Sequence, residues 1–223
     1  MIICKDICKN YNEKIVLKNV NIAFKKGNVS CILGHSGVGK TTLLNAIAGL
    51  DNYNGEIIGL GGKISYAFQT PCLVENMSVI DNILFACTCL SKNEIENCLE
   101  KLEMKGLANS LAKNLSVGEK QRVNFLRALL YFPNLLILDE TFSSLDVKSK
   151  LLCEKLLLEY KNKCNFTVIM VTHDYSLALS LADEIFVLTQ DKVELIEIRK
   201  DKNGNKILTE KQLKEKLLLA FNV

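Results

Sequence analysis

The chain has 223 residues, of which 48% are apolar and 24% charged, the ordinary balance of a globular protein with a proper core. Its net charge of +3 is too small to indicate nucleic acid or an anionic membrane surface as a partner. The apolar runs 135–138 and 166–171 are far shorter than the roughly 20 residues that a membrane-spanning helix needs. We therefore expect a cytoplasmic protein with no nucleic-acid partner, whose contact with a membrane runs through another chain.

The nine cysteines are odd in number and contain no C-x-x-C pair. The two nearest in sequence, Cys87 and Cys89, are one residue apart. This pattern favours reduced thiols in a reducing compartment over a disulfide or metal site.

The first part of the chain predicts strands and one helix. Segments 2–8 and 16–24 alternate apolar with polar residues, which predicts two half-exposed strands of a small antiparallel layer. Segment 29–33 is a short apolar run, typical of a buried parallel strand. A helix is expected from about 39 to 48, with Gly49 as its C-terminal stop.

The remainder is more helical, and its alternation of strand and helix predicts a parallel sheet with crossovers. Helices are expected at 79–90, 93–104, 117–131, 147–160 and 175–182. Strands are expected at 135–138, 167–171 and 185–188, followed by a hairpin of 193–198 and 206–208 around Asn203-Gly204.

A last helix is expected to begin at a capping box formed by Thr209 and Gln212. Leu213, Leu217 and Phe221 give this helix one apolar face. The simplest use of that face is packing against the core.

A phosphate-binding loop is predicted between the strand 29–33 and the following helix. Gly34-His35-Ser36-Gly37-Val38-Gly39-Lys40-Thr41 fits G-x-x-x-x-G-K-[ST]. Glycines let backbone amides curl around phosphate oxygens, and the helix directs its positive end at the same anion. Lys40 would contact the β- and γ-phosphates, and Thr41 would offer its hydroxyl to Mg²⁺. The predicted nucleotide contacts here are Gly34, Ser36, Gly37, Gly39, Lys40, Thr41 and Thr42.

Two carboxylates, Asp139 and Glu140, end the apolar strand 135–138. Because unpaired buried carboxylates are costly, acids at the tip of a buried strand indicate a function. Asp139 is placed to hold the metal, and Glu140 to orient an attacking water, which is most of what phosphoryl transfer requires. The alternative is a surface turn with two exposed acids, which is less favoured beside a phosphate loop.

Residues 115–122, Leu-Ser-Val-Gly-Glu-Lys-Gln-Arg, resemble the L-S-G-G-[QE] signature of the ABC (ATP-binding cassette) ATPases. The resemblance covers nearly the whole chain, with the family's motifs in the family's order. Tyr11 matches the aromatic residue that stacks on adenine, Gln69 the Q-loop glutamine, 143–146 the D-loop and His173 the switch histidine. Taken singly, each has a structural alternative: a strand aromatic, a loop glutamine, a core histidine, or a helix N-cap at Ser116. Their joint occurrence favours the family.

The resemblance implies an α/β fold of the P-loop NTPase (RecA-like) type. It has a parallel-sheet core, an N-terminal antiparallel β layer and an inserted α-helical subdomain. We expect a single ATP-binding domain over 1–223. Its parts are a core at about 1–69 and 133–192, a helical subdomain at about 70–132, and a short hairpin and helix at about 193–223.

The resemblance also implies a site shared by two nucleotide domains paired head to tail. Ser116 and the Gly118 N–H would face the partner's γ-phosphate, next to a D-loop that ends at Asp146. The implied catalytic residues are Glu140 for the water, His173 for the γ-phosphate and Gln69 as a sensor of metal and water. The implied Mg²⁺ set is Thr41, Gln69 and Asp139.

Two positions depart from the family's commonest pattern. Val117 replaces the first signature glycine, and a β-branched residue there excludes positive φ. The position can still work if it is helical, because its N–H survives. Thr141 replaces the proline that often follows the carboxylate pair, and we expect it to alter the stiffness of the loop rather than the chemistry.

Residues 139–146 are similar to the importer form D-E-P-F-[SG]-[AS]-L-D. Among importers, the motifs most resemble those of the nitrate/sulfonate/taurine-type ATPases. We therefore expect an ATP-hydrolysing subunit, using ATP and Mg²⁺, that couples closure of a homodimer or heterodimer to a separate membrane permease. The permease would dock on about 70–90 and hold the subunit at the inner face of the cell membrane. An extracytoplasmic substrate-binding protein is expected in the same system.

Two alternatives stand beside the importer. A non-transport ATPase of the family, acting in DNA repair or on ribosomes, usually carries a coiled-coil insertion or two tandem cassettes, and only a short helical segment separates Gln69 from Leu115. A nucleotide sensor without turnover is the other, and the intact Glu140 and His173 argue against it. The transported substrate is not encoded in these motifs.

Overall fold

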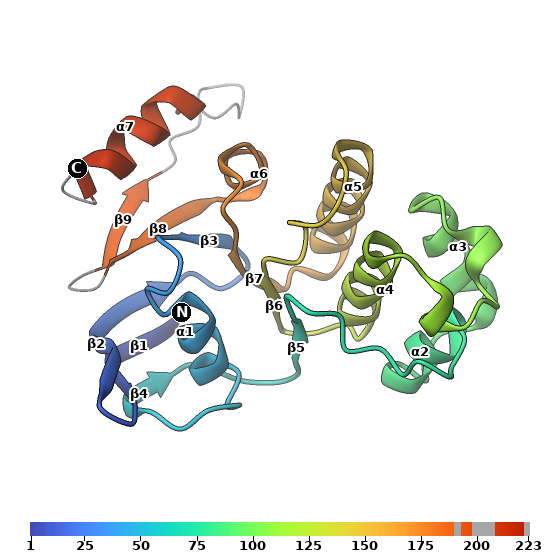
Figure 1. Cartoon of the computed structure of the whole chain (residues 1–223), viewed down its shortest axis with the longest axis horizontal. Coiled ribbons are helices and arrows are strands. Elements are labelled where there is room, and N and C mark those ends of the chain that lie inside the picture. Colours follow the sequence, from blue (N-terminus) through green and yellow to red (C-terminus); the bar gives the residue numbers. More distant parts are fainter. Residues whose placement is uncertain (190–192, 198–207, 221–223) are drawn as a thin grey trace. The chain divides into compact units, whose positions relative to one another are not determined.

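The computed structural model describes residues 1–189, 193–197 and 208–220. The chain forms two compact units, here called unit 1 (Met1–Gly62 with Thr167–Val223) and unit 2 (Lys63–Phe166), whose elements are labelled in Figure 1.

Unit 1 contains the antiparallel layer expected at the N-terminus. Strands β1 (Ile2–Tyr11), β2 (Lys14–Phe24) and β4 (Asn54–Ile58) lie in the order β2-β1-β4. Both pairings are antiparallel, and Asn12 turns the β1–β2 hairpin with a φ of 53°. The third strand, β4, is an addition to the two that the sequence predicts.

Unit 1 also contains the parallel strands that carry the phosphate loop. Strand β3 (Val29–Leu33) pairs in parallel with β7 (Thr167–Val171) on one side and β8 (Glu184–Leu188) on the other. All three strands are buried throughout, which explains their continuous apolar sequences. Strand β9 (Val193–Glu197) pairs antiparallel with β8. Of the predicted hairpin, the Asn203-Gly204 turn and residues 206–207 lie outside the described residues, and Leu208 is not in a strand.

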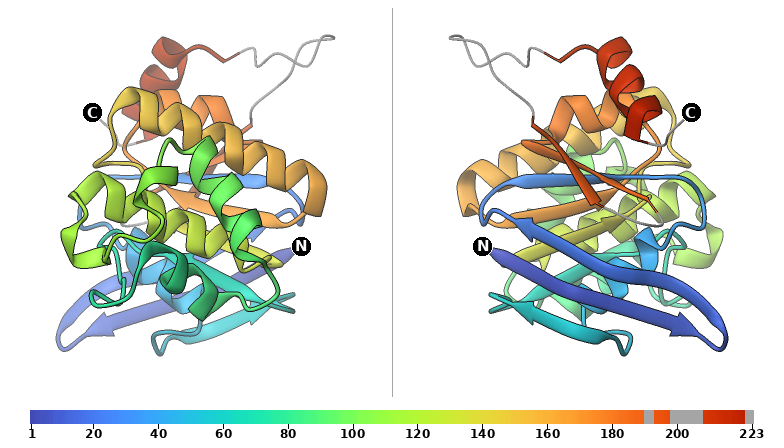
Figure 2. Two further views of the ribbon diagram at one scale, coloured as in Figure 1. Left: turned by 90° about the vertical axis from the view of Figure 1, so that its right-hand side faces the viewer. Right: turned by 90° about the vertical axis from the view of Figure 1, so that its left-hand side faces the viewer.

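The described part of unit 1 also has three helices, α1 (Lys40–Ile47), α6 (Tyr175–Leu181) and α7 (Glu210–Ala220). The predicted capping box of α7 is confirmed, because Thr209 N–H donates to Gln212 Oε1 at 2.9 Å and Gln212 N–H donates to Thr209 Oγ1 at 3.3 Å. Helix α7 packs beside α6 (Figure 2). Its side chains Leu213 and Leu217 are buried.

Unit 2 is built from two strands and four helices. Strands β5 (Ile64–Ala67) and β6 (Leu135–Asp139) pair in parallel. The helices are α2 (Val79–Ala86), α3 (Lys92–Lys101), α4 (Val117–Leu130) and α5 (Val147–Cys164), with short 3₁₀ turns at Lys105–Leu107 and Ala112–Asn114. Helix α4 contacts both α2 and α5, and Phe125 packs edge-on against Phe142 with ring centroids 5.2 Å apart.

Helices α2 and α3 end a few residues earlier than their apolar spacing predicts. Cys87 has extended dihedrals that stop α2, and Glu103 has a φ of 56° just after the end of α3. Local backbone geometry therefore ends these helices while apolar residues continue along the chain.

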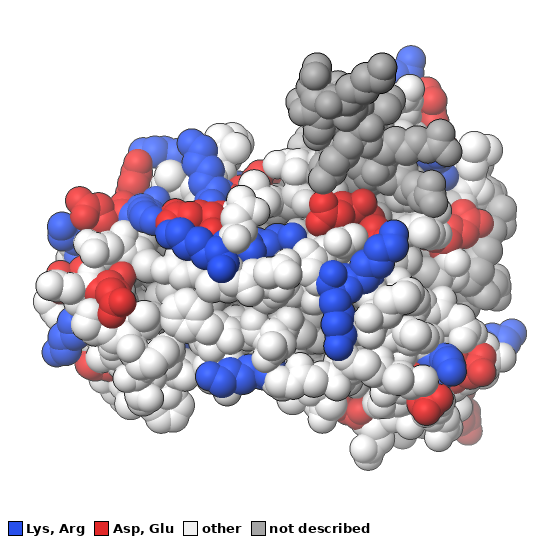
Figure 3. Space-filling view, turned by 180° about the vertical axis from the view of Figure 1, so that it is seen from behind, with Lys and Arg blue, Asp and Glu red and all other residues white. Residues whose placement is uncertain are grey.

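The surface and the helices agree with the modest charge and ordinary hydropathy of the sequence. Lysine and arginine side chains are interspersed with acidic ones over the face shown in Figure 3. Among the described residues, no helix combines the length and the apolar character that crossing a membrane requires.

Candidate active site

The loop between β3 and α1 has the backbone shape that its glycines suggest. Gly39 has a φ of 103°, and a Cβ there would lie 2.7 Å from Leu17 Cδ2. A Cβ on Gly34 would lie 2.5 Å from the carbonyl oxygen of Leu188. Both positions are therefore restricted to glycine, one by backbone conformation and packing and the other by the close approach of β8.

Lys40 folds back over this loop. Its ammonium donates to the carbonyl oxygens of Gly34 and His35, each at 2.8 Å, and the residue is only 5% exposed. Thr41 is exposed at the start of α1. Apart from Gly37 and its two chain neighbours, no described residue has an atom within 4 Å of the place where a Cβ on Gly37 would stand. A cationic side chain, a hydroxyl and an open loop at a helix N-terminus together fit a nucleotide phosphate and its Mg²⁺.

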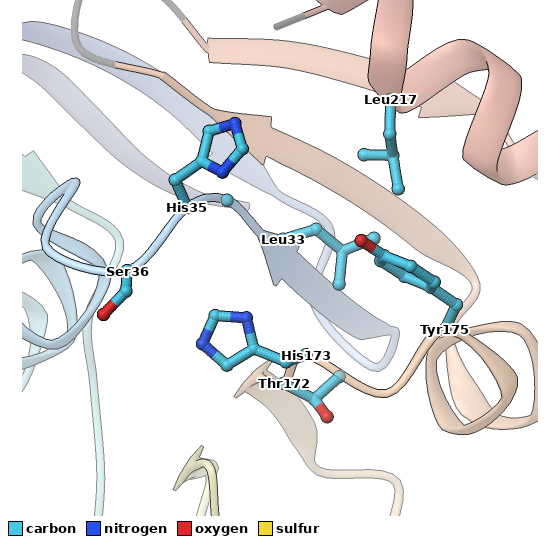
Figure 4. Close-up of a pocket in the computed structure, with 8 residues that line it drawn as sticks. Leu33, His35, Ser36, Thr172, His173, Tyr175 and Leu217 are labelled. Carbon is cyan, nitrogen blue, oxygen red and sulfur yellow. The ribbon is translucent and has the colours of Figure 1, made fainter.

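His173, the predicted switch histidine, lines a cavity with residues of the phosphate loop. A cavity of about 280 Å³ is lined by Leu33, Gly34, His35, Ser36, Thr172, His173, Tyr175 and Leu217. In Figure 4, His173 lies on the side of the cavity near Ser36, and Leu217 points from α7 toward Tyr175. Unit 1 thus brings His173 and the phosphate loop together. Leu217 of α7 also lines this cavity, a contribution that the sequence did not indicate.

Tyr11 lies at the end of β1, in the same unit. Its hydroxyl donates to Asp51 Oδ2 and also interacts with the hydroxyl of Thr42, in the first turn of α1. Lys9 forms an ion pair with Asp51 at 2.5 Å. Sequence reasoning missed Lys9 and Asp51, because they matter only through contacts between segments about 40 residues apart.

Unit 2 gathers the two carboxylates and the Q-loop glutamine at the ends of β5 and β6. Gln69 Nε2 donates to Glu140 Oε2 at 3.5 Å, and the Tyr66 hydroxyl donates to Asp139 Oδ2 at 3.2 Å. Asp139 is 2% exposed, whereas Glu140 is partly accessible, with a φ of 46° that turns the chain out of the strand. The parallel pairing of the two strands explains why residues 71 and 73 positions apart in the sequence lie together here.

Tyr66 is a second residue that the sequence did not single out. Burial, and then the neighbouring Asp139 carboxylate, raise the pKa of Tyr66 far above its usual value. The phenol therefore remains protonated and acts as a fixed donor to the carboxylate that is predicted to hold the metal.

Thr141 takes the place of the more usual proline and is buried. Its hydroxyl donates to the carbonyl oxygen of Ala67 at 3.0 Å, which ties the loop after β6 to the end of β5. This side-chain bond gives a physical basis for an altered loop stiffness.

The signature segment opens α4, as expected for a helix N-cap. Ser116 forms a capping box with Glu119: the Glu119 N–H donates to Ser116 Oγ at 3.3 Å, and Ser116 N–H donates to the Glu119 carboxylate at 2.8 Å. These bonds from Ser116 hold the pKa of Glu119 below its usual value. Val117 is the first residue of the helix, is 67% exposed and has no positive φ, which meets the helical condition set for this position by the sequence.

The D-loop lies next to this helix start. A Cβ on Gly118 would lie 3.7 Å from Leu145 Cδ2 and 3.9 Å from Ser144 O. Asp146 caps α5 by accepting from the Ser149 N–H at 3.0 Å. Unit 2 therefore joins the signature and the D-loop, and gives Asp146 a local structural role.

Helix α4 also holds the Q-loop backbone. Gln121 and Asn124, both buried, donate from their side-chain amides to Phe68 O at 3.2 Å and 3.0 Å, and Gln121 donates to Gln69 O at 3.4 Å. The segment that carries Gln69 is thus anchored to the helix that begins with the signature.

The phosphate loop on β3 and α1, together with carboxylates at the end of a parallel strand, defines a P-loop nucleotide-binding domain. Residues 17–143 match the sequence model of the family described as ABC transporter. The chain belongs to this family, as its motifs predicted.

Known relatives agree with this assignment. The chain is 36% identical over 211 residues to the sulfate/thiosulfate import ATP-binding protein CysA of Neisseria meningitidis, covering 85% of this chain and 59% of that protein. It is 36% identical over 186 residues to the aliphatic sulfonates import ATP-binding protein SsuB of Corynebacterium glutamicum, covering 81% of this chain and 76% of that protein. The chain therefore spans only about three fifths of the length of CysA.

A solved structure agrees in fold. The ATP-binding cassette MJ0796, in a dimeric post-hydrolysis state bound to ADP and Pi, superposes with a TM-score of 0.78 at 29% identity. The superposition covers 89% of this chain and 99% of that one, which confirms the predicted α/β P-loop fold.

Proposed function

We propose that the chain is the ATP-hydrolysing subunit of an ABC importer. The observation that carries this proposal is the grouping of Gln69, Asp139 and Glu140 at the ends of two paired parallel strands, in a chain that also has an intact phosphate loop. The printed names of CysA and SsuB, both import ATP-binding proteins, support the importer assignment.

In this proposal the chain's own groups act mainly by position and charge. Backbone amides of 34–41 and the Lys40 ammonium hold the phosphates. Thr41, Asp139 and Gln69 would hold Mg²⁺, which when bound neutralises charge on the phosphate oxygens. Glu140 orients the attacking water, and the Gln69 amide limits where its carboxylate can point.

The proposed active form is a head-to-tail pair. Ser116 and the Gly118 N–H, at the start of α4, would face the γ-phosphate held by the second subunit, where the helix N-terminus favours an anion. His173 would contact the same phosphate from the loop side, near the partner's D-loop.

Glu140→Gln tests the hydrolytic role. We expect this variant to bind ATP, to lose hydrolysis by about 100-fold or more, and to elute from a sizing column as an ATP-dependent dimer. The matched control is Glu100→Gln, an exposed glutamate of α3 that pairs with Lys105. Normal hydrolysis by Glu140→Gln would show that another group positions the water.

The proposed partner is an integral membrane permease that docks on residues 70–90. Two apolar side chains there are unusually exposed, Phe85 at 71% and Val74 at 40%. A subunit held by a permease would lie at the inner face of the cell membrane, and a substrate-binding protein on the outside would complete the system.

Phe85→Glu tests the docking surface. We expect this variant to bind ATP normally and to lose co-purification with solubilised membranes, since a charge there would oppose burial against the permease. Leu219→Glu, at an equally exposed leucine of α7, is the control. Equal recovery of both variants with the membrane fraction would place the permease contact elsewhere.

A further inference from the structure

The contacts around Tyr11 form a small cluster with Lys9 and Asp51, here called the clamp. The Tyr11 hydroxyl donates to Asp51 Oδ2, and Lys9 Nζ donates to Asp51 Oδ1 at 2.5 Å. The same ammonium donates to Asn52 O at 2.6 Å and lies 4.8 Å from the centroid of the Tyr11 ring. One carboxylate thus holds the phenol end of the ring, and one cation lies over its face.

The clamp is more sheltered than an ordinary surface ion pair. The side chains of Lys9 and Asp51 are 14% and 23% exposed. A second ion pair of β1, between Lys5 and Glu56 of β4, is 4.0 Å apart with exposures of 53% and 64%. Loose exposed pairs contribute little, so the contrast indicates that the geometry of the clamp is specifically fixed.

Charge states in the clamp suit this arrangement. The hydrogen bond from Lys9, and then that from Tyr11, hold the pKa of Asp51 below its usual value. The hydrogen bond to Asp51 raises the pKa of Tyr11. At neutral pH the aspartate is therefore the acceptor and the phenol the donor.

The two residues that contact the Tyr11 hydroxyl, Thr42 and Asp51, lie in α1 and in the turn that follows it. Thr42 is in the first turn of α1, and Asp51 follows three residues after the C-cap, Ala48. Helix α1 begins at Lys40, at the end of the phosphate loop. The Tyr11 ring is thus attached to the element that carries the phosphate contacts, although it stands at the tip of a different sheet.

We propose that Lys9 and Asp51 are positioning residues that hold the Tyr11 ring as a nucleobase platform at a set distance from the phosphate loop. This inference rests on the proposed function, together with the adenine-stacking role that the family resemblance implies for Tyr11. A ring already held in place loses little rotamer freedom when the base binds, so the clamp favours nucleotide affinity without touching the nucleotide.

The test uses the full chain with Asp51→Ala or Lys9→Met. We expect the KM for ATP to rise about three- to tenfold, the range that one ordered aromatic contact supplies, with little change in kcat. Affinity for inorganic triphosphate with Mg²⁺, which has no base, should stay within about twofold of the parent value. Lys5→Met and Glu56→Ala are the matched controls and should change neither quantity.

Further variants separate the clamp from the platform. Tyr11→Ala should raise the KM for ATP at least as much as Asp51→Ala, and adding Asp51→Ala to it should cause no further loss, because the aspartate acts through the ring. Lys9→Arg should largely restore the parent KM. Asp51→Asn, which keeps an acceptor for the phenol, provides a milder variant if the alanine does not fold.

Each contrary result has a distinct meaning. An equal loss of ATP and triphosphate affinity in Asp51→Ala would show that the aspartate supports the phosphate loop, and would overturn the inference. An unchanged KM in both clamp variants, with a raised KM in Tyr11→Ala, would overturn the clamp and leave the proposed function standing. An unchanged KM in Tyr11→Ala would refute the stacking role itself.

Discussion

The structure gives a reason for Thr141, the residue that replaces the usual proline after the carboxylate pair. A proline at this position would have no hydroxyl to give, whereas the threonine bonds the carbonyl of Ala67 in a buried setting. The sequence indicated the substitution and a change in stiffness, but the acceptor lies 74 residues away and could not be identified from the motif.

We expect Thr141→Val to lower the free energy of unfolding by about 1–3 kcal/mol, because it preserves shape but leaves the Ala67 carbonyl without its donor. Urea denaturation followed by circular dichroism would measure this. Ser143→Ala, which removes an exposed hydroxyl bonded to Glu140 O at 2.8 Å, is the comparison, since water can replace that bond. Equal losses in the two variants would show that burial is not the cause.

Among individual residues, those of the phosphate loop and the carboxylate pair could be predicted because their spacing along the chain is itself the signal. Lys9, Asp51 and Tyr66 could not be, because each matters only through a partner that folding brings near. Lys9 lies in an alternating strand and Asp51 in a loop, and neither sequence pattern indicates which residue the side chain will contact.

At the scale of elements, apolar period and turn residues predicted the buried strands and most helices. Strand β5 was missed because four residues are too few to show a period. Strand β4 was missed because nearly all of it is exposed, and only its pairing with β1 makes it a strand. Long-range pairing decided both cases, and no local pattern records it.

The link between α4 and the Q-loop leads to a further prediction. Asn124→Ala removes a fully buried donor to Phe68 O, and we expect it to lower the free energy of unfolding by about 1–3 kcal/mol. Amide hydrogens near Gln69 should exchange faster, since their segment loses an anchor. Asn76→Ala, at an exposed side chain that accepts from Lys113 at 3.4 Å, is the control. Unchanged exchange near Gln69 would contradict the anchoring.

At the scale of the whole molecule, the predicted site residues fall into two sets. Unit 1 has the phosphate loop, Tyr11 and His173, and unit 2 has the carboxylates, Gln69, the signature and the D-loop. The boundaries of the units fall at 62/63 and 166/167 in the sequence, whereas the motif spacing led us to expect a helical subdomain at about 70–132. The two units are defined by contacts between residues and not by motifs. The bounds of the expected helical subdomain therefore remain a prediction.

The function proposed for the whole molecule requires that the loop ending at Lys40 binds a nucleoside triphosphate. Titration calorimetry with Mg-ATP tests it most directly, comparing the parent chain with Lys40→Ala and with Lys26→Ala, an exposed lysine outside the loop. We predict saturable binding below about 1 mM for the parent and for Lys26→Ala. Lys40→Ala should show no binding while its circular dichroism spectrum shows that the fold is intact. No heat of binding from the folded parent chain at millimolar Mg-ATP would contradict the account.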